Sequence, residues 1–295
     1  MPAGAGGLTP LSPSVGGKLG LIAGGGALPR SLADHCRETG RPYFVIRLRG
    51  FADAEIAVHP GAEAGIAELG KVFDLLKRED CRTVCMAGVV KRPDFAALKP
   101  DLRGLRMLPG AIAAARKGDD ALLRFVLGEF EREGFAIEGA DAVFGDMTLG
   151  EGAHGRLAPQ ALHQPDMALA VQVAVAMGAL DIGQAAAVAG GVVLAVEAQE
   201  GTDAMLARCA DLPAALRGTH DARLGVLIKW PKPIQDRRVD LPVIGVKTIE
   251  GAAAAGLAGV VGQAGGALVV DKPAVIAAAD RLGLFLIGLP AGTTP

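Results

Sequence analysis

The hydrophobic positions in the first half of the chain fall into short apolar runs that alternate with longer amphipathic segments. The apolar runs predict buried strands at residues 18–23, 42–48 and 81–90. The amphipathic segments predict helices at residues 28–39, 65–79 and 119–133. Gly40 is well placed to end the first of these helices. Strands and helices that alternate in this way predict a parallel sheet with crossover helices, and therefore an N-terminal Rossmann-like α/β domain.

The pattern changes at residues 142–165, where glycines, two prolines and polar residues interrupt it. Beyond this point we expect helices at 166–178 and 203–209, strand-like runs at 184–197 around Gly190-Gly191, a strand at 224–229, and renewed alternation at 243–289. We place the domain junction in the interrupted region. The prediction is a disordered leader at 1–17, an N-terminal domain at 18–150, a linker at 151–165 and a distinct C-terminal α/β catalytic domain at 166–295.

One apolar stretch, residues 251–270, is uncharged and long enough to span a bilayer. It contains six glycines, seven alanines and Gln263, so its hydrophobicity is low. We therefore interpret it as a helix, a strand, a turn and a further strand. The leader lacks a basic region followed by an apolar run, which argues against a signal peptide. We expect a cytoplasmic protein.

Composition narrows the class of ligand. The chain has 295 residues, of which 51% are hydrophobic but only 4% aromatic, and small residues of this kind suit close packing of helices on sheets. The formal net charge of −2 offers no general attraction for nucleic acid. The four cysteines form no CxxC pair and read as buried thiols in a reducing compartment. The histidines are scattered, so we expect no histidine metal site.

A glycine run, Gly24-Gly25-Gly26, follows the first predicted strand. Backbone without Cβ atoms can approach a phosphate closely at a helix N-terminus. A tight strand-to-helix turn is the alternative reading. The dinucleotide motif GxGxxG fails because Pro29 stands at the third glycine position, and the next predicted strand carries Arg47 rather than an acid. A nicotinamide cofactor is therefore disfavoured.

Charged residues follow the third predicted strand and begin the helix at 119–133. Gly88, Lys91 and Arg92 stand where ligands bind in α/β folds, so the two cations are placed to neutralise a phosphate, unless they are simply solvated loop charges. Asp119 and Asp120 either cap the helix or contact a metal or a substrate hydroxyl.

A second acidic group stands at the mouth of a predicted strand in the C-terminal half. Glu197, Glu200 and Asp203 lie close together in the segment EAQEGTD. Thr202 or Asp203 can cap the helix that follows. A ligand-binding carboxylate is the functional alternative, because α/β folds bind ligands at this end of their strands.

The most informative segment runs from Lys229 to Gly245. Asp236 and Asp240 are four residues apart. On a helix they would lie about 6 Å apart and could share one ion, whereas on a strand they would lie about 13 Å apart and could not. Lys229 and Lys232 precede them, and two arginines lie between. Carboxylates that hold Mg²⁺ beside cations that neutralise phosphate oxygens are typical of phosphoryl transfer.

Six motifs together resemble one family. They are IAGGGALP (22–29), GVVKRP (88–93), KGDDALLR (117–124), LDIGQ (180–184), EAQEGTDAMLAR (197–208) and KPIQDRRVDLPVIG (232–245). The chain resembles the magnesium-dependent UDP-2,3-diacylglucosamine pyrophosphatases of lipid A biosynthesis, the type unrelated to calcineurin-like phosphoesterases. The similarity runs from about Leu19 to Leu289. Six motifs in order across both domains are highly specific, where one alone would be weak.

This resemblance implies hydrolysis of UDP-2,3-diacylglucosamine to UMP and 2,3-diacylglucosamine 1-phosphate, with Mg²⁺ as the cofactor. It places the family's essential aspartate at Asp236 first and Asp240 second, and we assign both as metal ligands, with Lys232 as a further catalytic residue. It also implies that the lipid product binds between the two domains. The candidate substrate-binding residues in or beside the motifs are Gly24, Gly25, Gly26, Gly88, Lys91, Arg92, Asp119, Asp120, Glu200, Thr202, Asp203, Lys229 and Gln235.

Two other function classes compete with hydrolysis. A non-catalytic carrier of a nucleotide-linked lipid would not need paired carboxylates beside a phosphate. A nicotinamide oxidoreductase is opposed by Pro29. No nucleic-acid partner is expected, whereas peripheral contact with the inner membrane and a homodimer are both compatible with the sequence.

Overall fold

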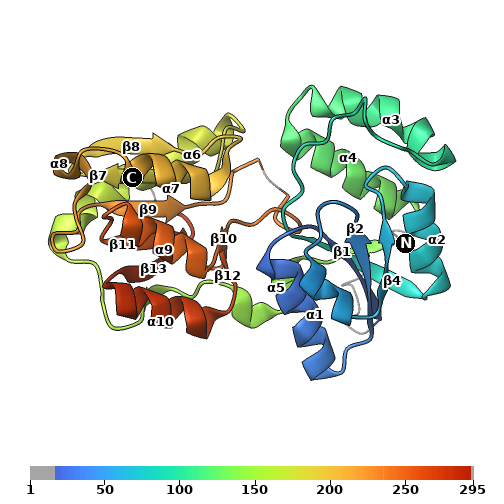
Figure 1. Cartoon of the computed structure of the whole chain (residues 1–295), viewed down its shortest axis with the longest axis horizontal. Helices are drawn as coiled ribbons and strands as arrows, with labels where there is room; N and C mark the ends of the chain where they lie inside the picture. Colours follow the sequence, from blue (N-terminus) through green and yellow to red (C-terminus); the bar gives the residue numbers. More distant parts are fainter. Residues whose placement is uncertain (1–16, 235, 294–295) are drawn as a thin grey trace, which may run out of the picture.

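The computed structural model describes residues 17–234 and 236–293. They form two lobes, each built on its own β-sheet (Figure 1). The expected two-domain α/β class is thereby confirmed. Nearly all of the predicted leader, and also Gln235, lie outside the described residues.

The first lobe contains a five-stranded parallel sheet in the order β3-β2-β1-β4-β5. Strand order 3-2-1-4-5 is typical of doubly wound sheets, which bind ligands beyond the carboxyl ends of their strands. The strands are β1 (Lys18–Ala23), β2 (Tyr43–Leu48), β3 (Gly61–Ala64), β4 (Cys81–Ala87) and β5 (Ala136–Ile137).

Helices cover both faces of this sheet. Buried residues of α1 (Ala27–Thr39) and α5 (Ala140–Val143) pack on one face, against alternate residues of β1 such as Leu21. Buried residues of α2 (Leu69–Arg78) and α4 (Asp119–Arg132) pack on the other face, against Ile22 and its neighbours. A further helix, α3 (Leu102–Ala115), lies outside α4 at the edge of the lobe (Figure 1).

The second lobe contains a six-stranded mixed sheet in the order β6-β13-β11-β9-β7-β8. Strands β9, β11 and β13 are parallel to one another, whereas β6 and β7 pair antiparallel with their neighbours. The strands are β6 (Gly152–His154), β7 (Ala185–Ala189), β8 (Val192–Val196), β9 (Val226–Lys229), β11 (Gly259–Gln263) and β13 (Phe285–Leu289). The segment predicted as a linker, 151–165, thus contains β6 and the short 3-10 helix η3 (Ala161–His163).

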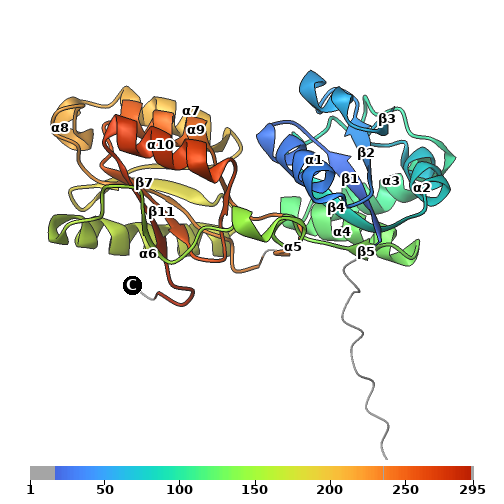
Figure 2. The same ribbon diagram turned by 90° about the horizontal axis from the view of Figure 1, so that it is seen from below.

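Helix α6 (Gln164–Ala179) lies on one face of the second sheet, and three helices lie on the other (Figure 2). Those three are α7 (Gly201–Ala210), α9 (Val246–Ala254) and α10 (Lys272–Leu282). Alternate residues of β7 divide between the two faces: Ala186 packs with α6 and Ala187 with the other three helices. The short helix α8 is Ala214–Arg217.

The two lobes share part of one apolar core. Leu241, Leu268 and Val270 come from the second half of the chain, yet they pack in the same buried cluster as β1, α1 and α5 of the first lobe. Leu268 belongs to β12 (Leu268–Val269), which pairs with β10 (Val243–Ile244) in a small two-stranded sheet. The chain therefore crosses between the lobes more than once.

Most of the predicted elements are present, and the differences include shifted boundaries and short elements that were not predicted, among them β3 and β5. The helix expected from residue 65 begins at Leu69, because a turn at 65–68 precedes it and the Glu68 carboxylate accepts a hydrogen bond from the Gly65 amide. The strand expected to reach residue 90 ends at Ala87, since Gly88 has a φ of +91°. Helix α3 was not predicted.

Residues 251–270 contain a helix end, a strand, a turn and a further strand, as expected. Within the described residues, no helix is long and apolar enough to cross a membrane. All four cysteines are buried and unpaired, as expected. Burial raises the pKa of each thiol, to about 11 for Cys81.

Candidate functional site

The charged segment after β9 runs alongside helix α4 of the first lobe. Lys232 lies near Asp119 at the start of α4, Asp236 near Arg124, and Arg238 near the end of the helix. The Arg238 Nη1 donates to Glu131 Oε1 at 2.8 Å. The charged segment that carries Lys232, Asp236 and Arg238 is therefore held between the two lobes.

Asp119 connects the lobes at the N-terminus of α4. It accepts a hydrogen bond from Arg92 Nη1 at 3.2 Å within its own lobe. It also accepts one from Gln199 Nε2 of the second lobe at 3.1 Å. Arg92 is itself fixed by donating to the Ala115 carbonyl at 2.6 Å. Residues of three separate motifs thus meet at one carboxylate.

Lys232 lies beside this junction and binds Asp181 of the same lobe, with 2.8 Å between Nζ and Oδ1. Burial alone would lower the pKa of Lys232, but the hydrogen bond to Asp181 and the nearby carboxylates of Asp240 and Asp119 outweigh it and raise the pKa. Lys232 is therefore a cation at neutral pH, in a position where acidic groups from both lobes converge.

Asp236 is held in its ionised form by Arg238. It accepts hydrogen bonds from Arg238 Nη2 at 2.7 Å, from Nε at 3.0 Å and from the backbone amide of Arg238 at 3.0 Å. These hydrogen bonds hold the pKa of the Asp236 carboxyl below its usual range. A carboxylate with a lowered pKa suits charge stabilisation or metal binding better than proton abstraction at neutral pH.

Asp236 and Asp240 lie on one helical turn. The backbone amide of Asp240 donates to the Asp236 carbonyl at 3.3 Å, as in an α-helical turn, and the amide of Val239 donates to the same oxygen at 3.1 Å. Of the two alternatives that the spacing left open, the structure has the turn and not the strand. This arrangement is the one that brings side chains four residues apart to one face.

A chain of buried polar groups lies behind this turn. Lys229 Nζ donates to Thr202 Oγ1 at 2.9 Å, and Thr202 Oγ1 donates to Glu197 Oε1 at 2.7 Å. All three residues are buried. Burial lowers the pKa of Lys229, although Glu197, Asp203 and Asp240 oppose this effect. Glu197 follows β8 and Lys229 ends β9. Because β8 and β9 are both antiparallel to β7, they run in the same direction, and the two residues lie at the carboxyl ends of these strands.

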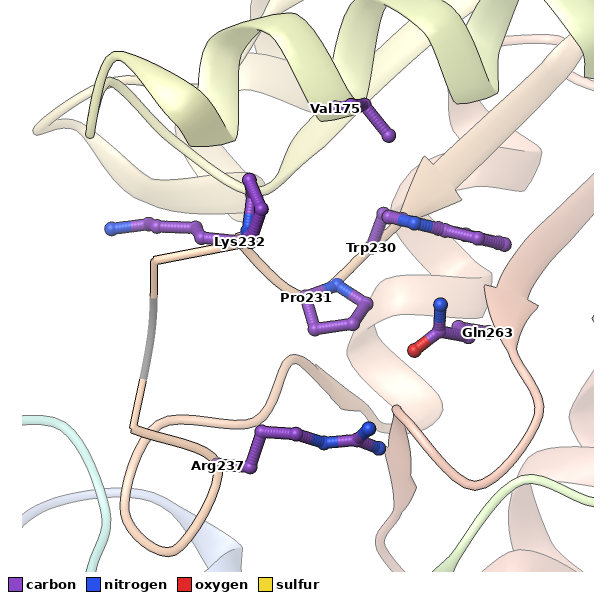
Figure 3. Close-up of a pocket in the computed structure, with 7 residues that line it drawn as sticks. Val175, Trp230, Pro231, Lys232, Arg237 and Gln263 are labelled. Carbon is purple, nitrogen blue, oxygen red and sulfur yellow. The ribbon is translucent and has the colours of Figure 1, made fainter. Parts of the chain in front are cut away.

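A cavity of about 260 Å³ adjoins the charged segment (Figure 3). Its lining residues come from α6, from 230–237 and from β11, and they are Val175, Trp230, Pro231, Lys232, Pro233, Arg237 and Gln263. In Figure 3 the Lys232 ammonium points away from Trp230, whereas the Arg237 guanidinium points toward Gln263. Arg237 Nη2 donates to the Gly265 carbonyl at 2.7 Å. The cavity is thus walled by the same segment that carries the candidate aspartates.

The glycines expected to approach a phosphate are packed against protein backbone. Gly24 and Gly25 donate to the carbonyls of Ala87 and Val89 at 2.8 and 3.0 Å. A Cβ atom on Gly88 would lie 2.6 Å from the Gly25 carbonyl oxygen. The Gly26 amide donates to the Asp53 carboxylate at 2.7 Å. These contacts match the tight-turn alternative, in which glycine is needed for close approach of the β1 and β4 ends.

The other candidates differ in their surroundings. Asp120 is buried and ion-paired with Arg124 one turn along α4. Glu200 pairs with Arg208 of α7, and its pKa is lowered first by its own backbone amide and then by Arg208. Asp203 lies close enough to Lys229 to affect its pKa. The Lys91 side chain makes no ion pair or hydrogen bond with the described part of the chain.

Three residues of the site were not singled out from the sequence: Asp181, Gln199 and Glu131. Asp181 lies in the motif LDIGQ and Gln199 in the motif EAQEGTDAMLAR, and position within a motif was their only signal. Asp181 has a φ of +55°, a backbone conformation rare outside glycine, which fixes it against Lys232. Glu131 lies on the exposed side of an amphipathic helix, where the sequence offers no sign of a partner.

Among the described residues there is no group of three or more histidine, cysteine, aspartate or glutamate side chains placed to hold a metal ion. The acidic groups nearest the junction of the lobes are instead paired with cations, as Asp236 is with Arg238 and Asp181 with Lys232. A metal ion that relied on protein ligands alone has no such group to bind among these residues.

Comparison with known proteins gives consistent matches along the chain. Residues 18–147 match the LpxI N-terminal domain family, and residues 150–287 match the LpxI C-terminal domain family. A protein of Caulobacter vibrioides named UDP-2,3-diacylglucosamine pyrophosphatase LpxI is 62% identical over 278 residues, which are 94% of this chain and 99% of the relative. A solved structure of CobK precorrin-6A reductase is 18% identical with a TM-score of 0.33, covering 94% of this chain and 89% of its own, a likeness too low to carry an argument.

Proposed function

The chain belongs to the LpxI family, and from this premise we propose that its two lobes act together to hydrolyse the pyrophosphate of UDP-2,3-diacylglucosamine with the help of Mg²⁺. It is a hydrolase of lipid A biosynthesis. The products in this proposal are UMP and 2,3-diacylglucosamine 1-phosphate.

The observation that carries the proposal is the meeting of motifs across the lobes. The hydrogen bond between Asp119 and Gln199, and the proximity of Asp119 to Lys232, bring residues of four motifs to one place. Cations and carboxylates arranged in this way suit a pyrophosphate that is bound between the lobes. A non-catalytic carrier gives no reason for so many ionised groups at the junction.

The residues present fit a Mg²⁺ ion that is bound mainly by the substrate. Mg²⁺ commonly keeps several waters and takes only one or two carboxylates besides substrate phosphates. Asp236 and Asp240, on one turn, supply that number of hard oxygen ligands. When bound, the ion supplies charge neutralisation at the pyrophosphate. The lowered pKa of Asp236 suits this role because the carboxylate stays ionised.

The remaining residues have roles that need no metal. Lys232 and Arg92 neutralise phosphate oxygens, and Arg238 keeps Asp236 oriented through two nitrogens. Lys229 is held by Thr202 behind the turn and positions this hydroxyl against Glu197. In the hydrolytic step, a water oxygen bonds to the β-phosphorus on the sugar side, and the bond from that phosphorus to the bridging oxygen breaks. The bridging oxygen leaves with UMP.

The first test is the reaction itself. The protein is incubated with UDP-2,3-diacylglucosamine and Mg²⁺, and UMP release is followed; a parallel sample is exhaustively chelated. We expect UMP only with the divalent cation. Binding without turnover would favour the carrier, and full activity after chelation would refute the metal requirement.

Hydrolysis in ¹⁸O-labelled water tests which phosphorus is attacked. Attack at the β-phosphorus puts the label in 2,3-diacylglucosamine 1-phosphate and none in UMP. Label in UMP would mean attack at the α-phosphorus and would overturn this part of the proposal without changing the overall reaction.

A substrate with two acyl chains also bears on location. We propose a cytoplasmic protein that meets the inner membrane peripherally to collect this lipid. Formation of a homodimer stays a prediction from the sequence.

A further inference from the structure

Helix α3 exposes an apolar face that the fold leaves uncovered. Of its fourteen residues only Gly104 and Ala115 are buried. Leu102 and Leu105 are 79% and 56% exposed. Positions 102, 105, 106, 109 and 113 share one helical face, which carries Leu, Leu, Arg, Pro and Ala. We call this face, with Arg116 at its end, the α3 surface.

The α3 surface lies in a strongly basic part of a slightly acidic chain. Residues 91–117 contain seven basic and two acidic side chains, a formal net charge of +5, whereas the whole chain has −2. Five of the basic side chains are exposed and make no ion pair or hydrogen bond with the described residues: Lys91, Lys99, Arg106, Arg116 and Lys117. Their charge is therefore available to a partner.

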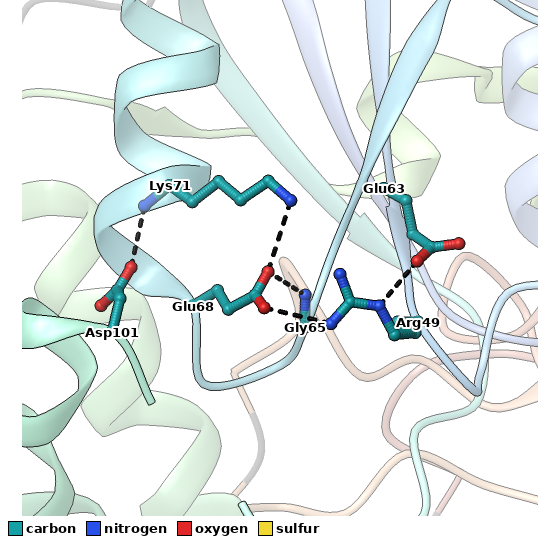
Figure 4. Close-up of polar contacts among 6 residues, drawn as sticks. All are labelled: Arg49, Glu63, Gly65, Glu68, Lys71 and Asp101. Carbon is teal, nitrogen blue, oxygen red and sulfur yellow. Dashed lines mark hydrogen bonds and ion pairs between the residues drawn. The ribbon is translucent and has the colours of Figure 1, made fainter. Parts of the chain in front are cut away.

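The two acidic side chains of this segment are engaged by backbone amides. Asp94 accepts from the amide of Ala96 at 3.0 Å. Asp101 caps α3 by accepting from Gly104 at 2.8 Å, and it also accepts from the Lys71 amide of α2 at 2.9 Å (Figure 4). These bonds fix the start of α3 against α2, so the outward face is held in a defined orientation.

The inward side of α3 is packed, which makes the outward side available. Gly110 lies directly against the Phe125 ring of α4, so that a Cβ atom there would come within 2.7 Å of it. Figure 1 shows α3 as the outermost helix of the first lobe, with α4 beneath it. A groove of about 1020 Å³ runs between α2 and α3, and Arg78 and Arg106 are among the cations that line it.

We propose that the α3 surface docks the protein on an anionic lipid bilayer. Leucines bury in the interface while arginines beside them reach the headgroups, as in helices that lie in the membrane plane. The free cations are attracted by anionic lipids. A nucleic acid gives no reason for exposed leucines, and a second copy of this chain would place like charges together.

This inference rests on the proposed function, because the lipid substrate is what brings the protein to a membrane. The end of α3 leads through Lys117 and Gly118 to Asp119, the carboxylate that joins the lobes. Docking through α3 thus places the junction of the lobes within a few residues of the lipid surface. A diacylated substrate then has a short path into the site.

Sedimentation with vesicles tests the proposal. The full-length protein is mixed with vesicles of phosphatidylcholine containing one third phosphatidylglycerol, and with vesicles of phosphatidylcholine alone. We expect binding to the anionic vesicles that weakens with added salt. Arg106→Gln with Arg116→Gln should lower the partition coefficient by about 30-fold, because each basic residue near an anionic surface contributes about 1 kcal/mol. Leu102→Ser with Leu105→Ser should lower it as well.

Matched variants on the second lobe serve as controls. Leu162 is 60% exposed, and Lys247 is exposed with no ion pair or hydrogen bond among the described residues. Leu162→Ser and Lys247→Gln should bind vesicles like the unmodified protein. Melting temperatures of all variants check that each is folded, and hydrolysis of detergent-solubilised substrate should be unchanged in all of them.

The outcomes separate this inference from the proposed function. Equal vesicle binding by the α3 variants and the unmodified protein would overturn the docking surface. Absence of binding to anionic vesicles would also overturn it, and an acidic protein would then be the partner for this face. Loss of hydrolysis in detergent by the α3 variants would instead place these residues in the catalytic site. Vesicle binding without any hydrolysis would support docking and contradict the proposed reaction.

Discussion

At the scale of single residues, the site is built from carboxylates that are held by named cations. Asp236 accepts hydrogen bonds from Arg238, which also donates to Glu131 of the other lobe. Asp119 accepts hydrogen bonds from Arg92 and from Gln199. These partners hold both carboxylates in fixed positions, so little reorganisation is needed when a charged substrate binds.

Replacing Asp236 tests the most specific residue assignment. We expect Asp236→Ala to lower kcat by orders of magnitude while the melting temperature changes little, because the lost group is half-buried and acts on charge at the pyrophosphate. UMP release is the measurement. Asp211→Ala, at the exposed end of α7, is the control and should retain full activity. A folded Asp236→Ala protein with normal turnover would remove the residue from the mechanism.

The buried hydroxyl of Thr202 gives a second residue-scale prediction. Thr202→Val keeps the shape but removes both the acceptor for Lys229 and the donor to Glu197. We expect a loss of about 1–3 kcal/mol in the free energy of unfolding, since two buried polar groups lose a hydrogen-bond partner. We also expect an altered pH profile of kcat. Thr202→Ser should restore both properties, and an unaltered profile in Thr202→Val would limit Thr202 to a structural role.

The sequence indicates which charged residues matter more readily than what each one touches. The spacing of Asp236 and Asp240 left a helix and a strand open, because local periodicity is ambiguous in a proline-bounded segment. The partners Asp181, Glu131 and Gln199 come from other elements, and contacts between elements depend on packing that no single motif encodes. For the glycines, the sequence offered a tight strand-to-helix turn as the alternative, but it did not predict their contact with the end of β4.

At the scale of elements, the start of α2 is stabilised by one carboxylate. Glu68 accepts from the Gly65 amide at 2.9 Å and from Arg49 at 3.0 Å (Figure 4). These bonds lower the pKa of Glu68 to about 2, from an ordinary value of 4.5. The native state thus binds fewer protons than the unfolded chain between these values. The stabilisation is complete above pH 4.5 and is lost as the pH falls toward 2.

Glu68→Gln should therefore lower the free energy of unfolding by about 1 kcal/mol at pH 7, and the difference from the unmodified protein should shrink as the pH falls from 4.5 toward 2. Denaturant unfolding across this range is the measurement. Glu63→Gln is the control: Glu63 also binds Arg49, but as an exposed surface pair it should matter little. A pH-independent difference would contradict the assignment to Glu68.

Strongly periodic elements were predictable, and α3 was not, for a physical reason. Strand β1 is a short run of buried apolar residues, and helix α4 buries Leu127 and Phe130 from its apolar positions, so their hydrophobic pattern reveals them. Helix α3 buries little, carries Pro109 inside it and owes its start to the Asp101 cap. Gly104, Pro109 and Gly110 are poor helix formers, so the composition of this segment argues against a helix.

At the scale of the whole molecule, the lobes are joined both by apolar contacts and by polar bonds at the site. The hydrogen bond between Asp119 and Gln199 links the N-terminus of α4 to the loop before α7. If both lobes contribute to one site, Asp119 and Gln199 should affect turnover through the bond between them. The effect of replacing one residue should then depend on whether the other is present.

A double-mutant cycle measures that coupling. We expect Asp119→Ala and Gln199→Ala each to lower kcat/KM, and the double variant to show an interaction energy of about 1 kcal/mol rather than additive losses. Asp119→Ala combined with Glu250→Gln, on the distant helix α9, should be additive. Additivity in the first pair would mean that the bond across the lobes plays no part in catalysis.

The shared core has a consequence for how the protein is made. The cluster beneath α1 and α5 is completed by Leu241, Leu268 and Val270, which leave the ribosome long after the rest of the first lobe. Domains generally fold in the order of their synthesis. Here the first lobe cannot complete its core, and part of its apolar surface stays exposed to solvent, until nearly the whole chain has been translated. The two lobes are therefore one unit of biogenesis, although they look like two domains in the finished molecule.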